Sequence, residues 1–184
     1  MPTPAKTSRE ALAIIARRLV EASGPDALTV GAVAKAAGIK APSLYKHFAD
    51  RAALLKAVEI DVIHELEAYL RQETRGADPK SRLKALARAY RRFGTMAPNR
   101  YRVIYSSSAF IDPEIRAACL FAAQPLFEEF RAAGIPEPRI LPVSRTIVPF
   151  LHGFVLMEIG SAFTLGGDID EAFETGLETI LGKL

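Results

Sequence analysis

Apolar residues recur along most of the chain at the three- and four-residue spacing of an amphipathic α-helix. The first stripe at this spacing consists of Leu12, Ile15, Ala16, Leu19 and Val20. It places one apolar face on a helix that Ser8 is suited to cap and that Gly24-Pro25 is suited to end. No segment of the sequence shows the sustained alternation of apolar and polar residues that marks a half-buried strand. The pattern therefore predicts an all-α protein.

Two short helices joined by a tight turn are predicted after the first helix. Thr29 is suited to cap the first of them, whose apolar spacing covers residues 30–37. Gly38 follows at once and can adopt the left-handed conformation of a sharp helix exit. Pro42 fits the first turn of the second helix, which extends to Phe48. Two short helices around a glycine turn predict a helix-turn-helix.

The rest of the chain continues as helices bounded by proline, glycine or a capping residue. A long helix is expected from a cap at Asp50 to about Gln72. The later helices are expected from Pro79 to Gly94, from Pro98 through Tyr101 and Tyr105, from Pro113 to Gly134, from beyond Leu141-Pro142 to about Phe163, and onward from a cap at Asp168.

The composition is that of an ordinary globular protein: of 184 residues, 24% are charged and 49% belong to the most apolar types. Cys119 is the single cysteine, which excludes a disulfide framework within one chain and a cysteine-based zinc cluster. The longest apolar run, residues 147–157, is interrupted and shorter than the ~20 residues that span a bilayer. The polar N-terminus has no apolar signal core. We therefore expect a cytoplasmic protein with no membrane partner, no metal and no cofactor.

Basic charge is concentrated in the first third of the chain. Residues 1–56 contain nine lysines and arginines against four acidic residues, a net charge of +5, while the other 128 residues contain 15 against 17, a net charge of −2. A basic segment on a slightly acidic body indicates a head that binds a polyanion. A solvated surface that is basic by chance is the alternative.

The second short helix would present a small, polar tip with basic flanks to solvent. This surface consists of Lys40, Ala41, Pro42, Ser43 and Lys46. A tip of this size fits into the major groove of DNA, while lysines and hydroxyl groups contact phosphates on either side. The pattern therefore predicts double-stranded DNA as the partner of this segment.

The same stretch resembles the TetR-type transcriptional repressors. The resemblance covers about residues 8–56 and is carried by Leu28-Thr29-Val30, Val33-Ala34, Ala37-Gly38-Ile39, Ser43-Leu44-Tyr45-Lys46-His47-Phe48 and Ala53-Leu54-Leu55. It implies a three-helix DNA-binding head over residues 1–50 and a helical domain over residues 51–184 that binds a small effector and dimerises. The segments Phe150–Phe154 and Phe173–Leu181 are also similar to C-terminal segments of this family.

The resemblance assigns roles to individual residues of the head. It implies that Thr29, Tyr45 and His47 contact phosphates, and that Lys40, Ala41, Pro42, Ser43 and Lys46 lie where operator bases and adjoining phosphates are read. Arg51 and Lys56, at the start of the linking helix, are expected to reach the DNA backbone. Phe48 is expected to fill the core, and a core role for Tyr45 and a plain surface role for His47 are the alternatives. Gly31 stands where many members have a guanine-binding arginine.

The resemblance places an effector site inside the C-terminal domain. The candidate lining residues are Phe93, Met96, Tyr101, Tyr105, Phe110, Phe121, His152 and Met157. Each aromatic or methionine could instead fill the core. His152 is the strongest candidate, because a polar ring in an apolar helix needs a partner from the protein or from a ligand. The apolar character of the set indicates a hydrophobic or aromatic effector.

The predicted helix that ends near Phe163 is apolar almost all round, which requires burial both in its own domain and against a second copy of the chain. Together with the last helix it would form the interface of a homodimer. The candidate interface residues are Ile147, Val148, Leu151, Val155, Ile159, Phe163, Phe173, Leu177, Ile180 and Leu181.

These features favour a one-component repressor, released from a near-palindromic operator by a small molecule, with the linking helix as the lever. A helical ligand-binding or scaffold protein that has lost operator binding is the first alternative, and Gly31 is the observation that supports it. A small helical enzyme is the second alternative. Ser106–Ser108 and His152 have no placed acid partner and no Gly-x-Ser-x-Gly elbow, so we expect no catalytic residues.

Overall fold

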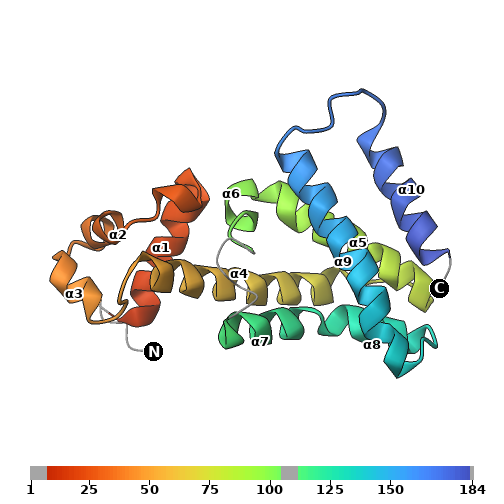
Figure 1. The fold of residues 1–184 in the computed structure, drawn as a ribbon, viewed down its shortest axis with the longest axis horizontal. Coiled ribbons are helices and arrows are strands. Elements are labelled where there is room, and N and C mark those ends of the chain that lie inside the picture. The colour runs from red at the N-terminus through yellow and green to blue at the C-terminus, as the bar shows by residue number, and fades with distance from the viewer. Residues whose placement is uncertain (1–7, 105–111, 183–184) are drawn as a thin grey trace. The chain divides into compact units, whose positions relative to one another are not determined.

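The computed structural model describes residues 8–104 and 112–182, and within these ranges the chain forms helices and no strand (Figure 1). The predicted all-α class is therefore confirmed. The chain divides into two compact units. Unit 1 consists of Met1–His64 and Ala97–Cys119, and unit 2 consists of Glu65–Met96 and Leu120–Leu184.

The two compact units do not follow the expected functional division after residue 50. Helix α4 (Arg51–Glu73) is continuous and contributes its first half to unit 1 and its second half to unit 2. Residues 97–119 also belong to unit 1, although they follow the first helix of unit 2 in sequence. A DNA-binding part over residues 1–50 and an effector part over residues 51–184 remain a prediction about function.

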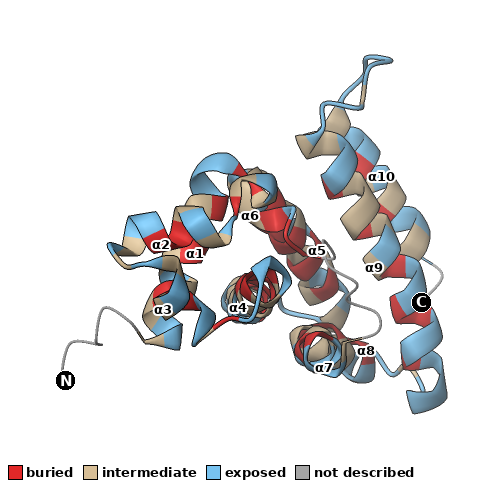
Figure 2. Cartoon of the chain, turned by 60° about the vertical axis from the view of Figure 1, so that its left-hand side comes forward, coloured by how far each residue is buried: buried red, intermediate tan, exposed pale blue. Residues whose placement is uncertain are grey.

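Unit 1 contains the predicted helix-turn-helix. Its elements are α1 (Arg9–Ser23), the 3₁₀ turn η1 (Pro25–Ala27), α2 (Val30–Ala37), α3 (Ala41–Tyr45), the first part of α4, α6 (Pro98–Tyr101) and most of α7 (Pro113–Ala122). Helix α1 packs against α2 and α6, and α2 packs against α3. The buried residues of α1, Leu12, Ala16 and Val20, lie four residues apart and so form a single face, as the sequence predicts (Figure 2).

The expected capping residues are confirmed. The Ser8 hydroxyl accepts a hydrogen bond from the Ala11 amide at 3.1 Å, and the Thr29 hydroxyl accepts one from the Ala32 amide at 3.0 Å. The Asp50 carboxylate accepts one from the Ala53 amide at 2.8 Å. Each bond satisfies an amide that the first turn of a helix leaves without an intrahelical partner.

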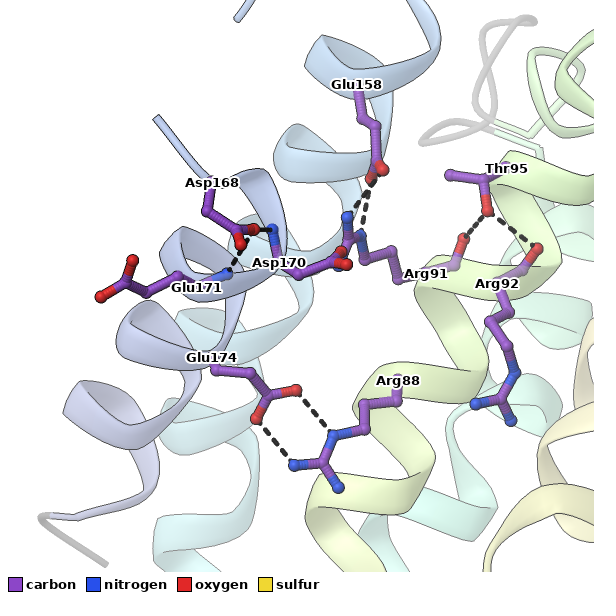
Figure 3. Close-up of polar contacts among 9 residues, drawn as sticks. All are labelled: Arg88, Arg91, Arg92, Thr95, Glu158, Asp168, Asp170, Glu171 and Glu174. Carbon is purple, nitrogen blue, oxygen red and sulfur yellow. Dashed lines mark hydrogen bonds and ion pairs between the residues drawn. The ribbon is translucent and has the colours of Figure 1, made fainter. Parts of the chain in front are cut away.

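Unit 2 is built from the second part of α4 and from α5 (Pro79–Met96), α8 (Gln124–Ala132), α9 (Glu137–Ile159) and α10 (Ile169–Leu181). Helix α5 packs against α8, α9 and α10, and α9 packs against α8 and α10. The largest fully buried side chains of this unit include Phe93, Phe130 and Phe173. Asp168 caps α10 by accepting hydrogen bonds from the amides of Asp170 and Glu171, at 2.8 and 3.2 Å, as predicted (Figure 3).

The boundaries of four predicted helices were wrong. The second short helix, α3, ends at Tyr45 rather than at Phe48. The segment from Pro113 to Gly134 is not one helix but α7 and α8, with a break at Ala123 just before Pro125, which occupies the first turn of α8. Helix α9 begins at Glu137 and contains Pro142, because the burial of Ile140 and Val143 keeps the first turns helical despite a lost amide donor. It ends at Ile159 rather than near Phe163, and α6 ends at Tyr101.

Candidate nucleic-acid interface and effector domain

The turn between α2 and α3 has the geometry that the sequence predicts. Gly38 has φ +69° and ψ +30°, which is the left-handed region. The Ile39 amide donates to the Ala34 carbonyl at 3.0 Å and the Gly38 amide donates to the Lys35 carbonyl at 3.2 Å. This pair of bonds is a Schellman motif, which ends α2 sharply and sends the chain into α3.

Helix α3 is anchored by two apolar side chains on its inner side. Leu44 is fully buried, and Phe48, just beyond the helix, is only 1% exposed. Ala34 on α2 is also buried, and its small side chain lets the two helices approach closely. The interpretation of Phe48 as core is confirmed. With these anchors turned inward, Pro42 and Tyr45 are the exposed residues of α3.

The predicted DNA-contacting residues of the helix-turn-helix lie at or near the surface of unit 1. The exposed ones are Thr29, Lys40, Pro42, Tyr45 and Lys46, and the half-buried ones are Ala41, Ser43 and His47. Tyr45 is 54% exposed and is therefore not a core aromatic. The Thr29 oxygen caps α2, but its hydroxyl proton is not used by that bond and can be donated to a phosphate.

Arg51 and Lys56 use their charged groups inside unit 1. Arg51 donates to the carbonyl oxygens of Leu28 at 2.7 Å and Pro25 at 2.8 Å. Lys56 pairs with Asp112 at 2.7 Å and with Glu114 at 3.1 Å, and hydrogen bonds to these two carboxylates raise the pKa of its ammonium group. The charged groups of both residues therefore have partners within unit 1, and their contact with the DNA backbone stays a prediction.

Arg9 is a residue that the sequence reasoning did not select. Its guanidinium donates to the His47 carbonyl at 2.5 Å and lies over the Phe48 ring, 4.4 Å from the centroid. The contact joins the start of α1 to the end of the helix-turn-helix across 38 residues of sequence. Its basic charge was the only available signal, and charge alone does not show which partner a residue has.

The candidate effector residues differ in burial, and the described ones belong to both units. Phe93 and Tyr101 are almost completely buried and belong to different units. Met96, Phe121 and Met157 are exposed large apolar side chains, and His152 is half-buried on α9. Tyr105, Phe110 and the Ser106–Ser108 segment lie outside the described residues.

A surface cavity of about 310 Å³ is present in unit 2, at the start of α5 and the ends of α8 and α10. Its lining residues are Asp78, Pro79, Lys80, Leu83, Ala132, Ala133 and Leu181. None of the predicted effector residues contributes to this cavity. It is therefore not evidence for the predicted effector site.

His152 gives a pH-dependent prediction. Burial lowers the pKa of its imidazole below the ordinary value, so the folded state disfavours protonation. The stabilisation is complete above the unfolded pKa of about 6.5 and is lost as the pH falls from that value through the lower pKa of the folded state. At fixed protein concentration, the unfolding free energy should therefore decrease between about pH 7 and pH 5.

Denaturant titrations across this range measure the effect. His152→Gln should reduce the decrease, because the variant has no imidazole at this half-buried position. The paired carboxylates Glu174 and Glu178 have pKa values below the ordinary value of 4.5, because Arg88 and Lys84 bond to them, so they titrate outside this range. If the unfolding free energy decreased equally in His152→Gln and in the unaltered chain, the pH dependence could not be assigned to His152.

Six of the predicted dimer residues are instead part of the core of a single chain. Ile147, Leu151, Val155, Phe173, Leu177 and Leu181 are each at most 2% exposed. Their regular spacing makes one face on α9 and one on α10, and these faces pack within unit 2. The sequence could not distinguish this inner face from an outer one, because both are apolar. These six residues cannot also be covered by a partner.

The other four predicted dimer residues, Val148, Ile159, Phe163 and Ile180, are half-buried. Leu141, Leu156 and Met157 on α9 are exposed large apolar residues. By length and composition alone α9 could cross a membrane, a test that a core helix of a soluble protein also passes, and 33% of its most apolar window is buried. Much of its apolar surface is therefore not covered within one chain.

Ion pairs from α5 hold both α9 and α10 against it (Figure 3). Arg91 makes two bonds of 2.7 Å to Glu158, pairs with Asp170 at 2.7 Å, and lies over the Phe173 ring at 4.9 Å. One turn earlier, Arg88 makes two bonds of 2.7 Å to Glu174. These bonds raise the pKa of both guanidinium groups. Since most of these charged groups are partly solvated, the ion pairs contribute more to the orientation of α10 than to the unfolding free energy of the chain.

Two family models match the chain, and together they span most of it. The model for bacterial regulatory proteins of the tetR family matches residues 15–58, and the model for the tetracyclin repressor-like C-terminal domain matches residues 83–180, more than half of the chain. The chain belongs to the TetR family. The resemblance that the helix-turn-helix residues indicate is thus confirmed, and the C-terminal match extends it through α10.

Known proteins support the assignment to the TetR family. An uncharacterized HTH-type transcriptional regulator of Mycobacterium tuberculosis, Rv0681, is 33% identical over 163 residues, which is 85% of this chain and 72% of that protein. A protein of unknown function from Rhodococcus sp. RHA1 is 22% identical with a TM-score of 0.81, over 100% of this chain and 97% of that chain. A TetR variant of Acinetobacter baumannii AYE, solved in complex with minocycline, is 22% identical with a TM-score of 0.71. The match covers 96% of this chain and 95% of that chain.

Membership in the TetR family makes this chain a DNA-binding transcriptional regulator with a helix-turn-helix head. Regulators of this family are soluble proteins and are typically non-enzymatic. They bind DNA and small-molecule effectors as dimers.

Proposed function

We propose that this chain is a cytoplasmic, homodimeric repressor that binds a near-palindromic operator through α3 and is released by an apolar or aromatic effector. The observation that carries the proposal is the outer surface of the helix-turn-helix. Leu44 and Phe48 are buried, while Lys40, Tyr45 and Lys46 are exposed around the small residues Ala41 and Ser43. The partner of such a surface is the major groove of duplex DNA.

The proposed DNA surface separates by chemistry into two groups. Thr29, Tyr45 and His47 carry hydroxyl or imidazole groups suited to phosphates, which fix the register of the protein on the duplex. Ala41, Pro42 and Ser43 form a small tip that can approach base edges, with Lys40 and Lys46 beside it. Gly31 contributes no side chain, so base reading depends on the tip of α3.

The proposed dimer uses the apolar surface of α9, of α10 and of the segment between them that is not buried within the chain. We assign to it Val148, Ile159, Phe163 and Ile180 together with the exposed Leu141 and Leu156. A partner copy would remove this surface from water, which favours association by about 25 cal/mol per Å² before the cost of binding. Two heads would then face two half-sites spaced by about one helical turn of DNA or more.

The proposed effector binds within the C-terminal domain, and its candidate contacts are the accessible residues Met96, Phe121, His152 and Met157. The minocycline complex of the Acinetobacter protein supports a small molecule as the ligand type. Release requires an effector that prefers a conformation in which the two heads are wrongly spaced. The continuous helix α4 is the proposed lever, because both units share it.

The assigned roles predict different effects of three substitutions at the DNA surface. Tyr45→Phe or His47→Ala should weaken binding about fivefold on every duplex, since each removes a phosphate contact of roughly 1 kcal/mol. Ser43→Ala should change which base is preferred at one position, by about tenfold. Selection of duplexes from a random-sequence pool, followed by affinity measurements on single-base variants, gives both quantities.

The same experiment separates the proposal from its alternative. If the three variants behaved alike, the assignment of roles would be wrong. If the unaltered chain enriched no duplex and showed no retention that falls steeply with salt, a ligand-binding or scaffold protein without operator binding would be favoured, as Gly31 suggests.

A further inference from the structure

The entry to the helix-turn-helix is held by one guanidinium. Arg51, the first residue of α4, donates through Nε to the Leu28 carbonyl at 2.7 Å and through a terminal nitrogen to the Pro25 carbonyl at 2.8 Å. Both carbonyls belong to the short segment that leads into Thr29, the cap of α2. Arg51 therefore fixes the backbone immediately before a proposed phosphate contact.

The exit of the helix-turn-helix is held by a second guanidinium. Arg9, the first residue of α1, donates to the His47 carbonyl at 2.5 Å and lies 4.4 Å from the centroid of the Phe48 ring. His47 is itself a proposed phosphate contact, and Phe48 is one of the two anchors of α3. Arg9 therefore fixes the backbone immediately after the proposed DNA surface.

Helix α3 depends on such external support. It spans five residues, Ala41–Tyr45, and an isolated helix of this length is not stable in water. Leu44 and Phe48 hold its inner side, but apolar contacts do not fix the path of the backbone at either end as hydrogen bonds to carbonyl oxygens do. A DNA surface whose backbone is already ordered loses less entropy when it binds.

We propose that Arg9 and Arg51 are positioning residues that hold the two ends of the helix-turn-helix in its DNA-binding conformation. The inference rests on the proposed binding of DNA through α3. A guanidinium suits this role because its planar fork can donate to two carbonyls at once, as Arg51 does. A lysine at position 51 keeps the charge but has a single, rotating ammonium group and cannot reproduce the fork. A lysine at position 9 lacks the planar guanidinium that donates to the His47 carbonyl while it lies over the Phe48 ring.

The test compares three arginines, each changed to lysine and to glutamine. Arg18, exposed on the same helix as Arg9, is the control. The probes are the duplex that the unaltered chain selects from a random pool and a duplex of scrambled sequence. Circular dichroism and thermal melting establish that each variant is folded at the assay temperature. Arg9 and Arg51 are both exposed residues, so their variants should keep the fold.

If Arg9 and Arg51 are positioning residues, their replacement should lower the affinity for the selected duplex, and a lysine that keeps the positive charge should not restore it. Arg9→Lys and Arg51→Lys should each weaken binding to the selected duplex by about tenfold, and Arg9→Gln and Arg51→Gln by a similar factor. The Arg→Lys variants should change binding to the scrambled duplex less than about twofold, because non-specific binding follows charge. Global destabilisation would not produce this difference between duplexes. The slope of log affinity against log salt should stay the same in all four variants.

A phosphate contact would give a different result, and it would overturn the inference. In that case lysine would restore most of the affinity, and glutamine would reduce the salt slope by about 0.9 per lost contact. Equal losses in the Arg18 variants would also overturn it.

Amide hydrogen exchange provides a second measurement on the free protein. The Leu28 and Phe48 amides, which donate to the carbonyls of Pro25 and Leu44, should exchange faster in Arg51→Lys and Arg9→Lys respectively, at an unchanged melting temperature. Unchanged exchange at these amides would contradict the inference even if binding were weaker. If the unaltered chain selected no duplex, the proposed function would fail instead, whereas this exchange result would still show whether the arginines order the segments.

Discussion

Replacing Phe173 with alanine is expected to lower the unfolding free energy of the chain by about 3–5 kcal/mol, the usual cost of removing a buried phenylalanine side chain. Phe173 is 1% exposed. Its ring stacks on Phe150 at 5.8 Å between centroids, meets Phe154 edge-on at 5.1 Å, and lies under the Arg91 guanidinium. The substitution would leave a cavity among these three side chains and weaken the attachment of α10 to the rest of unit 2.

The matched control for Phe173→Ala is Ile180→Ala, on the same helix at a half-buried position. If Ile180 lies in the proposed dimer interface, its replacement should cost the single chain less than about 1 kcal/mol and mainly raise the dimer dissociation constant. Denaturant unfolding at several protein concentrations separates the two effects, because dimer dissociation depends on concentration and the stability of one chain does not.

A contrary result for this pair of variants would also be informative. If Phe173→Ala changed only the dimer dissociation constant, with an unaltered stability of the single chain, the assignment of Phe173 to the core of one chain would be wrong. If Ile180→Ala did not change dimerisation at any concentration, Ile180 would have to be removed from the proposed interface.

The local features of the fold could be predicted because they depend on neighbouring residues. A cap such as Thr29 accepts a hydrogen bond from an amide three residues away, and Gly38 allows the left-handed conformation of its own backbone. The spacing of Leu12, Ala16 and Val20 likewise defines one face of one helix. Each of these signals is complete within about two turns of sequence, so the sequence alone determines it.

The partners of charged residues could not be predicted in this way. Arg51 and Lys56 are basic residues at the start of the linking helix, and the resemblance to the TetR family suggested DNA phosphates as their partners. Their partners in the structure lie 23 or more residues away, on Leu28 for Arg51 and on Asp112 for Lys56. Only the packing of unit 1 brings these groups together. The same limit applies to Arg9, whose partner follows α3.

The faces of α9 show a second limit of sequence patterns. Apolar residues surround most of this helix, so the sequence indicates burial on two sides without showing which residues serve each side. In the structure, Ile147 and Leu151 face the core of unit 2, whereas Leu156 is exposed. A homodimer interface on α9 stays a prediction, and the residues assigned to it change with the orientation of the helix.

Replacing Gly38 with valine is expected to lower the stability of unit 1 by roughly 1–3 kcal/mol, the cost of a strained backbone conformation. A β-branched residue at φ +69° brings its side chain against the backbone, whereas glycine has no Cβ. Nothing lies within 4 Å of the place where a Cβ would be, so the strain arises from the backbone and not from crowding. To relieve it, the chain would have to leave α2 at another angle, which would move α3.

The Gly38→Val variant should therefore lose more than about tenfold in affinity for the selected duplex, since a displaced α3 cannot keep its contacts to base edges. Gly38→Asn is the matched control, because asparagine tolerates the left-handed region, and it should cost less than about 1 kcal/mol. Thermal melting and binding to the selected duplex, measured on both variants, test the pair. Equal affinities for Val and Asn at this position would show that the sharp turn is not what places α3 on DNA.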